Sequence, residues 1–137
     1  MRLPTNREHK HHMFEVSVED TFAAGHALRG YRGKCENPHG HNYKVQITLN
    51  GERLDNIGLL FDFKDLKSAM NEIIERLDHK FINDLAPFTE LNPSAENMAK
   101  YFYEEIRTLL HDRTEDRVRV KLVKVWETDT TTATYFE

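Results

Sequence analysis

The spacing of apolar residues changes twice along the 137-residue chain, and this change limits the folds that the chain can adopt. Apolar and polar residues alternate over residues 14–18 and again over residues 43–49, the pattern of strands with one buried face. From residue 62 to residue 110 the apolar residues recur at steps of three and four, as in amphipathic helices. Alternation returns over residues 117–128 and 131–136. The sequence therefore predicts the order strand, strand, helix, helix, strand, strand.

This order predicts an α+β fold with a four-stranded antiparallel sheet and both helices on one side of it. Asp62 is expected to cap the first helix, and Asn92, with Pro93 in the first turn, is expected to cap the second. The apolar alternation shifts phase between Leu122 and Val123, which predicts a β-bulge or a strand covered on both faces. Because such a small sheet has exposed edges, association into a closed barrel is expected.

Length and composition narrow the class of protein. The length indicates one domain, which we place at residues 13–137 after a flexible N-terminal extension of residues 1–12. The net charge of -4 argues against a nucleic-acid-binding face, and no apolar run approaches the ~20 residues of a membrane span. A single cysteine cannot form an internal disulfide, so we expect a cytoplasmic location.

Histidines at two places in the chain predict a metal site. His39 and His41 are two residues apart, so their side chains leave the same face of a strand. His26 lies at the end of the preceding strand and meets them if the two strands form a hairpin. Three histidines with no obvious fourth protein ligand are typical of catalytic zinc, although copper or nickel would also bind.

Two other interpretations of the same residues stay open. Cys35 lies four residues before His39 and could complete a tetrahedron with His26 and His41, which would make the site closed and structural. Each histidine could also simply pack or face solvent, since a lone His-x-His pattern is short. The histidine spacing alone does not choose among these interpretations, so motifs elsewhere in the chain have to be considered with it.

Five separated motifs, "FAAGHAL", "CENPHGHNY", "LDHKFIND", "NPSAEN" and "VWET", occur in this order. Together they resemble the family of 6-pyruvoyl-tetrahydropterin and 6-carboxy-tetrahydropterin synthases, from about residue 14 to the C-terminus. The short chain and "KCENPHGHN" are most similar to the bacterial and archaeal carboxy-tetrahydropterin synthases of queuosine biosynthesis. The resemblance implies the tunnelling fold, in which trimers form a barrel and two trimers stack into a homohexamer.

The resemblance also implies roles for the metal site and the thiol. His26, His39 and His41 fall where the family holds zinc, and Cys35 falls on the catalytic cysteine. Pro38 stands where relatives usually carry leucine, but it leaves the spacing from cysteine to histidine intact.

Three acidic or basic residues further along the chain receive roles in the same way. Asp78 and His79 fall on the Asp-His pair that completes the catalytic group. Asp78 could instead be a surface charge, because adjacent residues on a helix point apart. Glu127 falls on the acid that binds the pterin ring, and one carboxylate can accept two parallel hydrogen bonds from the ring's amino group and N–H.

The implied substrate is 7,8-dihydroneopterin triphosphate, a small molecule. Zinc would acidify its side-chain hydroxyls, and a thiolate at Cys35 would remove a proton from a side-chain carbon. The basic loop with Arg29, Arg32 and Lys34 could hold the triphosphate, or a neighbouring subunit could do so. The expected product is 6-carboxy-5,6,7,8-tetrahydropterin, formed with loss of triphosphate and acetaldehyde.

Three alternatives remain for the function. The product could be 6-pyruvoyl-tetrahydropterin. It could also be 6-hydroxymethyl-dihydropterin for folate synthesis, because Glu36 directly follows Cys35 as in some side-chain-cleaving relatives. The protein could finally be a non-catalytic zinc or pterin-binding module that uses Cys35 as a ligand.

Overall fold

The structure is a computed structural model in which residues 12–114 and 116–137 are described. Its elements are β1 (Phe14–His26), η2 (Lys34–Glu36), β2 (His39–Gly51), α1 (Phe63–Leu77), η3 (Ile82–Asp84), α2 (Ala95–Leu110), β3 (Arg119–Thr128) and β4 (Thr131–Phe136). The predicted order of strands and helices is confirmed. The predicted N-terminal extension, apart from its last residue, lies outside the described residues.

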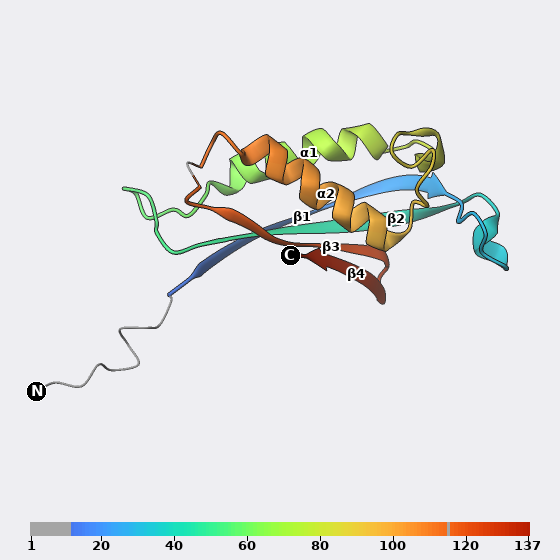
Figure 1. The fold of residues 1–137 in the computed structure, drawn as a ribbon, viewed down its shortest axis with the longest axis horizontal. Helices are drawn as coiled ribbons and strands as arrows, with labels where there is room; N and C mark the ends of the chain where they lie inside the picture. The colour runs from blue at the N-terminus through green and yellow to red at the C-terminus, as the bar shows by residue number, and fades with distance from the viewer. Residues whose placement is uncertain (1–11, 115) are drawn as a thin grey trace, which may run out of the picture.

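The four strands form one antiparallel sheet in the order β1-β2-β3-β4, with α1 and α2 together on one face (Figure 1). This arrangement confirms the predicted four-stranded α+β fold and leaves β1 and β4 as the two edge strands. In the part of the chain that the structure describes, no helix has the length and apolar character needed to span a bilayer.

The phase shift in the sequence of β3 corresponds to a bulge. Thr48 of β2 pairs with Leu122, whereas the next residue, Leu49, pairs with Val120, so that Lys121 is the extra residue. An extra residue turns the following side chains to the other face. The apolar side chains of Val118 before the bulge and Val123 after it are therefore both buried.

The first residues of the two helices follow the prediction in one case and depart from it in the other. Asp62 caps α1 as expected, because its side chain accepts a hydrogen bond from the backbone of Lys64. The predicted cap of α2 at Asn92 is wrong: Ser94 is the cap and accepts from the backbone of Asn97. The side chain of Asn92 is occupied elsewhere, because it binds both the N–H and the carbonyl of Arg29.

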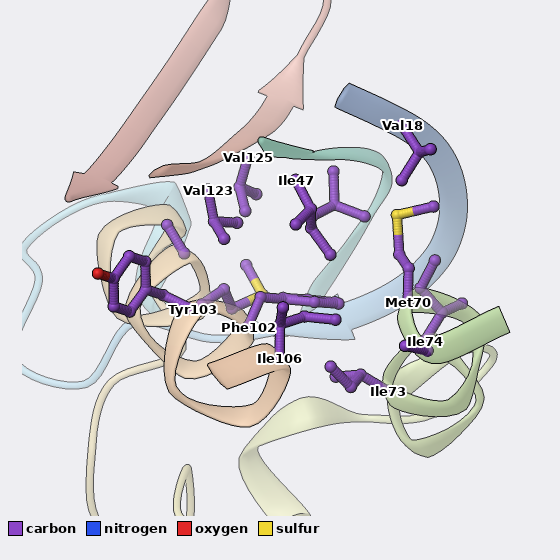
Figure 2. Packing of buried hydrophobic residues seen from close by; sticks show 14 of the residues in the cluster. Val18, Ile47, Met70, Ile73, Ile74, Phe102, Tyr103, Ile106, Val123 and Val125 are labelled. Carbon is purple, nitrogen blue, oxygen red and sulfur yellow. The ribbon is translucent and has the colours of Figure 1, made fainter. Parts of the chain in front are cut away.

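The core fills the space between the helices and the covered face of the sheet (Figure 2). Met70 and Ile73 from α1 and Phe102 from α2 are fully buried against Ile47 and Val125 of the sheet. Amphipathic helices are stabilised mainly by such packing of their apolar face. Phe22 of β1 and Tyr43 of β2 belong to this core and lie next to the end of the sheet that carries the histidines.

Candidate metal centre

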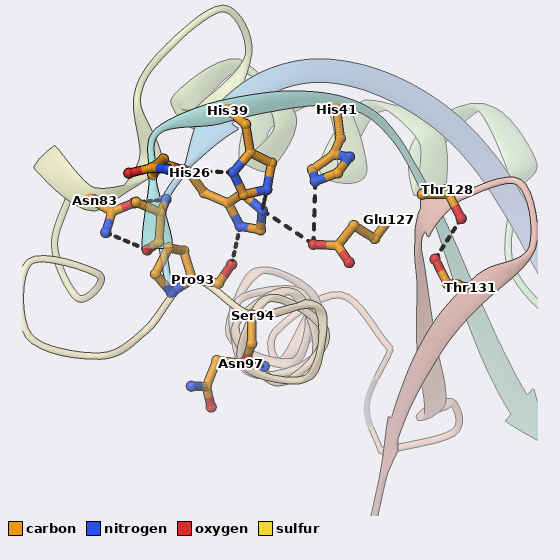
Figure 3. A network of polar contacts seen from close by, with 12 residues as sticks. His26, His39, His41, Asn83, Pro93, Ser94, Asn97, Glu127, Thr128 and Thr131 are labelled. Carbon is orange, nitrogen blue, oxygen red and sulfur yellow. Dashed lines mark hydrogen bonds and ion pairs between the residues drawn. The ribbon is translucent and has the colours of Figure 1, made fainter. Parts of the chain in front are cut away.

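The hairpin of β1 and β2 places three histidines side by side. His26 lies directly opposite His39, and His41 follows on the same face two residues later. The ring centroid of His26 lies 4.6 Å from that of His39 and 5.0 Å from that of His41, and the centroids of His39 and His41 are 4.8 Å apart (Figure 3). The predicted pairing of the two strands, and with it the convergence of the three rings, is confirmed.

Backbone carbonyls fix the tautomers of two of these rings. Nδ1 of His26 lies 2.7 Å from the carbonyl oxygen of Pro93, and Nδ1 of His39 lies 2.7 Å from that of Asn37. Because a carbonyl oxygen only accepts hydrogen bonds, each Nδ1 carries a proton and each neutral ring keeps a lone pair on Nε2. The two Nε2 atoms are 3.0 Å apart. Lone pairs at this distance repel unless a metal ion or an additional proton lies between them.

A proton on Nε2 of His26 is disfavoured. Burial lowers the pKa of His26 despite the opposing effects of the Pro93 carbonyl and the Glu127 charge, and burial also lowers the pKa of His41. Nε2 of His41 is itself buried without a hydrogen-bond partner. Neutral imidazoles with a free nitrogen are the form that binds metals.

A carboxylate completes the cluster. Glu127 sits at an irregularity in the pairing of β3 with β4, and bulges of this kind re-aim a side chain. Its Oε1 lies 3.2 Å from Nε2 of His26 and 3.5 Å from Nε2 of His41. The ligand atoms of Glu127, His26, His39 and His41 all lie within 4.8 Å of one another. Glu127 thus offers a fourth candidate ligand atom that the sequence pattern did not predict.

This donor set fits a zinc-type ion. Imidazole nitrogens and carboxylate oxygens are ordinary zinc ligands at distances of about 2.0–2.2 Å, so two ligand atoms of a tetrahedral site lie about 3.3 Å apart. The separations of 3.0, 3.2 and 3.5 Å within the cluster lie on both sides of that value. The missing hydrogen bond at Nε2 of His41 and the facing lone pairs of His26 and His39 are explained if an ion binds among them.

Cys35 lies outside this cluster. It is a half-buried free thiol in η2, and its carbonyl oxygen accepts a hydrogen bond from the backbone of Leu28 at 2.8 Å. Gly33, which precedes η2, has a φ of 148° that favours glycine. Among the described residues, the group of ligand atoms within 4.8 Å does not include the Cys35 sulfur. The closed Cys-His site is therefore not the arrangement that the structure shows.

Asp78 and His79 form a pair directly after α1. Oδ1 of Asp78 accepts the backbone N–H of Ala23 at 3.0 Å, and its Oδ2 lies 3.0 Å from Nδ1 of His79. The bond from Ala23 and then the one from His79 lower the pKa of Asp78. The alternative that these neighbours point apart, as on a helix, does not apply, because the helix ends at Leu77 and His79 has a left-handed backbone with φ of 59°.

The same turn is attached to the free edge of β1. The backbone N–H of His79 donates to the carbonyl of Ala23 at 2.6 Å, and that of Gly25 donates to Lys80 at 3.0 Å. His79 and His41 both line an open pocket of about 480 Å³. His79 thus borders the same pocket as one histidine of the metal cluster, and its side chain is 82% exposed.

The basic loop divides into a structural and an exposed part. The guanidinium of Arg29 donates to the carbonyl oxygens of Asn83, Phe88 and Leu91 at 2.8–3.3 Å. These bonds hold the loop after β1 against the segment before α2, so Arg29 is not available for the triphosphate as the sequence suggested. The side chains of Arg32 and Lys34 are exposed.

A second buried polar atom lies beside the cluster. The Tyr43 side chain is fully buried, with its ring stacked on Phe22 at 5.1 Å, and its hydroxyl has no hydrogen-bond partner. Burial and the charge of Glu127 raise the pKa of Tyr43. An unsatisfied buried hydroxyl costs about 1–3 kcal/mol.

Tyr43→Phe is therefore expected to stabilise the metal-free protein by about 1 kcal/mol, since the ring stays and the unsatisfied hydroxyl goes. Urea unfolding in the presence of a chelator measures this change. Tyr103→Phe is the matched control. The Tyr103 hydroxyl donates to the carbonyl of Val120 at 3.2 Å, so removal of this hydroxyl should destabilise the protein. Any destabilisation of the metal-free protein by Tyr43→Phe would contradict the prediction.

Comparison with known proteins identifies the family to which this site belongs. The sequence profile described as 6-pyruvoyl tetrahydropterin synthase matches residues 15–137. The chain belongs to the 6-pyruvoyl tetrahydropterin synthase family. Its curated relatives in this synthase family include the 6-carboxy-5,6,7,8-tetrahydropterin synthase of Haemophilus influenzae, which is 29% identical over 91% of the chain and all of that protein. They also include the 6-pyruvoyl tetrahydrobiopterin synthase of Homo sapiens, 37% identical over 88% of the chain and 90% of that protein.

Solved structures of the synthase family share the fold. The 6-pyruvoyl tetrahydropterin synthase of Caenorhabditis elegans superposes with a TM-score of 0.81 at 26% identity, over 91% of this chain and 96% of that chain. The Plasmodium vivax synthase superposes with a TM-score of 0.74 at 22% identity, over 92% and 98%. The four-stranded sheet with two helices is thus the fold of this synthase family.

Proposed function

We propose that the protein is a zinc-dependent lyase that converts 7,8-dihydroneopterin triphosphate to 6-carboxy-5,6,7,8-tetrahydropterin. Triphosphate and acetaldehyde leave, and one water is consumed, so that the atoms balance. The convergence of His26, His39 and His41 carries the proposal. Curated relatives named for this product in Haemophilus influenzae and Aquifex aeolicus, at 29% and 30% identity over at least 98% of their length, support it.

The proposed roles follow from where each group lies. His26, His39 and His41 would hold zinc, whose Lewis acidity favours loss of protons from the substrate's side-chain hydroxyls. Cys35 would take a proton from a side-chain carbon, and its position outside the ligand cluster leaves the sulfur free to do so. Asp78 orients the His79 ring by its contact with Nδ1, and His79 would move protons on the opposite side of the substrate.

Glu127 would bind the pterin ring. Its carboxylate lies beside the histidines and is 30% exposed, so a ring placed next to the metal can reach it. A carboxylate accepts two parallel hydrogen bonds from a pair of donors, as the ring's amino group and N–H provide.

We further propose that residues 13–137 form a single synthase domain and that its edge strands pair between copies. β4 and the part of β1 before Ala23 have no further strand beside them in the described chain, and exposed edges are usually covered by association. Pairing β1 of one copy with β4 of the next would close a barrel, and the exposed His79 on the β1 edge would then face a neighbouring copy. Light scattering should give the mass of three or six chains; a mass of one chain would contradict this assembly.

The second candidate product is 6-pyruvoyl-tetrahydropterin. The 37% identity to the human 6-pyruvoyl tetrahydrobiopterin synthase favours it. The third candidate product is 6-hydroxymethyl-dihydropterin, because Glu36 directly follows Cys35 as in some relatives that cleave the side chain. All three products differ in mass, as they do from the substrate.

One incubation separates these functions. The zinc-loaded protein is mixed with 7,8-dihydroneopterin triphosphate, and the products are identified by mass spectrometry together with an assay for acetaldehyde. We expect the carboxy product with one acetaldehyde per turnover. A pyruvoyl or hydroxymethyl product would contradict the proposed reaction and identify the corresponding alternative. Bound but unchanged substrate would indicate a non-catalytic pterin-binding module.

A further inference from the structure

Two functions compete for the Glu127 carboxylate. Its Oε1 lies 3.2 and 3.5 Å from Nε2 of His26 and His41, separations typical of ligand atoms that share one tetrahedral ion. Recognition of the pterin ring, by contrast, needs both carboxylate oxygens turned toward two parallel donors. One carboxylate cannot serve the ion and the ring fully at the same time.

The surroundings of Glu127 allow it to change between these functions. In the described part of the chain its side chain makes polar contacts only with His26 and His41, and it is 30% exposed. Within those same residues, no lysine or arginine forms an ion pair that holds the carboxylate in place. The rings of His26 and His39, in contrast, are held by hydrogen bonds to the Pro93 and Asn37 carbonyls.

We propose that Glu127 is the fourth metal ligand of the substrate-free protein and that the pterin ring draws it away from the metal. His26, His39 and His41 alone would then hold the metal while the ring is bound, which would leave a coordination position for the substrate. This inference rests on the proposed role of Glu127 in ring recognition, whereas the ligand role in the substrate-free protein stands on the geometry alone.

The exchange has a thermodynamic consequence. If ion and ring compete for one carboxylate, each weakens the binding of the other, and the factor is the same in both directions. A simple open three-histidine site predicts no such antagonism for a pterin that lacks side-chain hydroxyls. 6-Methylpterin is such a probe, since it carries the ring and no hydroxyl with which to bind the ion.

The first experiment tests ligation without any pterin. Zinc affinity is measured by competition with a chelator for the wild type, Glu127→Gln and Glu127→Asp, and the visible spectrum of the cobalt(II) forms reports the ligand set. Glu127→Gln should weaken zinc binding by at least about 10-fold, the lower end for loss of even an outer partner of a metal ligand, and should change the cobalt spectrum. Glu127→Asp keeps the charge but shortens the reach, and should also weaken binding.

Glu19→Gln is the matched control, because it removes one carboxylate of the same sheet that pairs with Lys44 and is not in the metal cluster. It should leave zinc affinity and cobalt spectrum unchanged. Wild-type zinc affinity in Glu127→Gln, or an equal loss in Glu19→Gln, would overturn the ligand role.

The second experiment tests the exchange. Binding of 6-methylpterin is measured by fluorescence for metal-free and zinc-loaded wild type. Zinc should weaken it by about 5-fold or more, the lower end of measured couplings between sites, and added pterin should shift the cobalt spectrum of the wild type toward that of Glu127→Gln. Equal pterin affinity with and without zinc overturns the exchange. Failure of the pterin to bind in either state overturns it together with ring recognition, while the zinc measurements still report separately on ligation.

Discussion

His39→Ala is expected to abolish stoichiometric zinc binding and product formation together. Nδ1 of His39 is held by the Asn37 carbonyl, so its Nε2 faces that of His26 at 3.0 Å as a preformed half of the site. Loss of an outer partner of a metal ligand already lowers affinity by about 10–100-fold, so loss of the ligand itself should cost at least about 100-fold. Zinc content after dialysis and turnover of 7,8-dihydroneopterin triphosphate measure both effects.

His111→Ala is the control for this prediction. His111 is exposed at the C-terminal end of α2 and does not belong to the metal cluster, so its loss removes an imidazole without touching the site. It should keep one zinc per chain and full turnover. One tightly bound zinc per chain in His39→Ala would refute the assignment of this histidine as a ligand.

The second large effect is expected at the thiol. Cys35→Ala should reduce turnover by roughly 10²–10⁴-fold, the contribution of a general base, and leave zinc content unchanged. The reason is positional: Cys35 lies in η2, and its sulfur is not among the gathered ligand atoms. Comparison of zinc content with single-turnover rates separates the two properties.

The opposite outcome is equally informative. If Cys35→Ala lost zinc as well as turnover, the thiol would be a ligand and the closed Cys-His site would be restored. Cys35→Ser tests the same point with a side chain of similar shape and a much weaker acid. It should retain zinc and remain nearly as inactive as the alanine variant.

Local periodicity in the sequence suffices to predict the hairpin and the bulge. Alternation in β1 and β2, with only a loop between them, is enough to bring His26 opposite His39, because the side chains of a hairpin repeat every two residues. The phase shift at Leu122 likewise predicts a bulge or a strand covered on both faces, and the structure has the bulge, because one extra residue reverses the alternation. Each of these features depends on neighbours along the chain or across one hairpin.

Contacts between distant residues leave no such local signal. Glu127 reaches the histidines because β3 pairs with β2, although both helices lie between these strands in the sequence. The irregularity in the pairing of β3 with β4 also contributes, because it changes the direction of the Glu127 side chain. Asn92 is a residue type that commonly caps helices. Its side chain instead binds the backbone of Arg29, 63 residues away in the sequence, and Ser94 caps α2. Asp78 and His79 form a pair only because α1 ends one residue before them.

X-ray absorption at the zinc edge tests the central claim most directly. The zinc-loaded, substrate-free protein should show only nitrogen and oxygen neighbours at about 2.0–2.2 Å, with the outer scattering of imidazole rings from His26, His39 and His41. A sulfur neighbour at about 2.3 Å would place Cys35 on the metal. That result would contradict a centre built from imidazoles with a free thiol beside it.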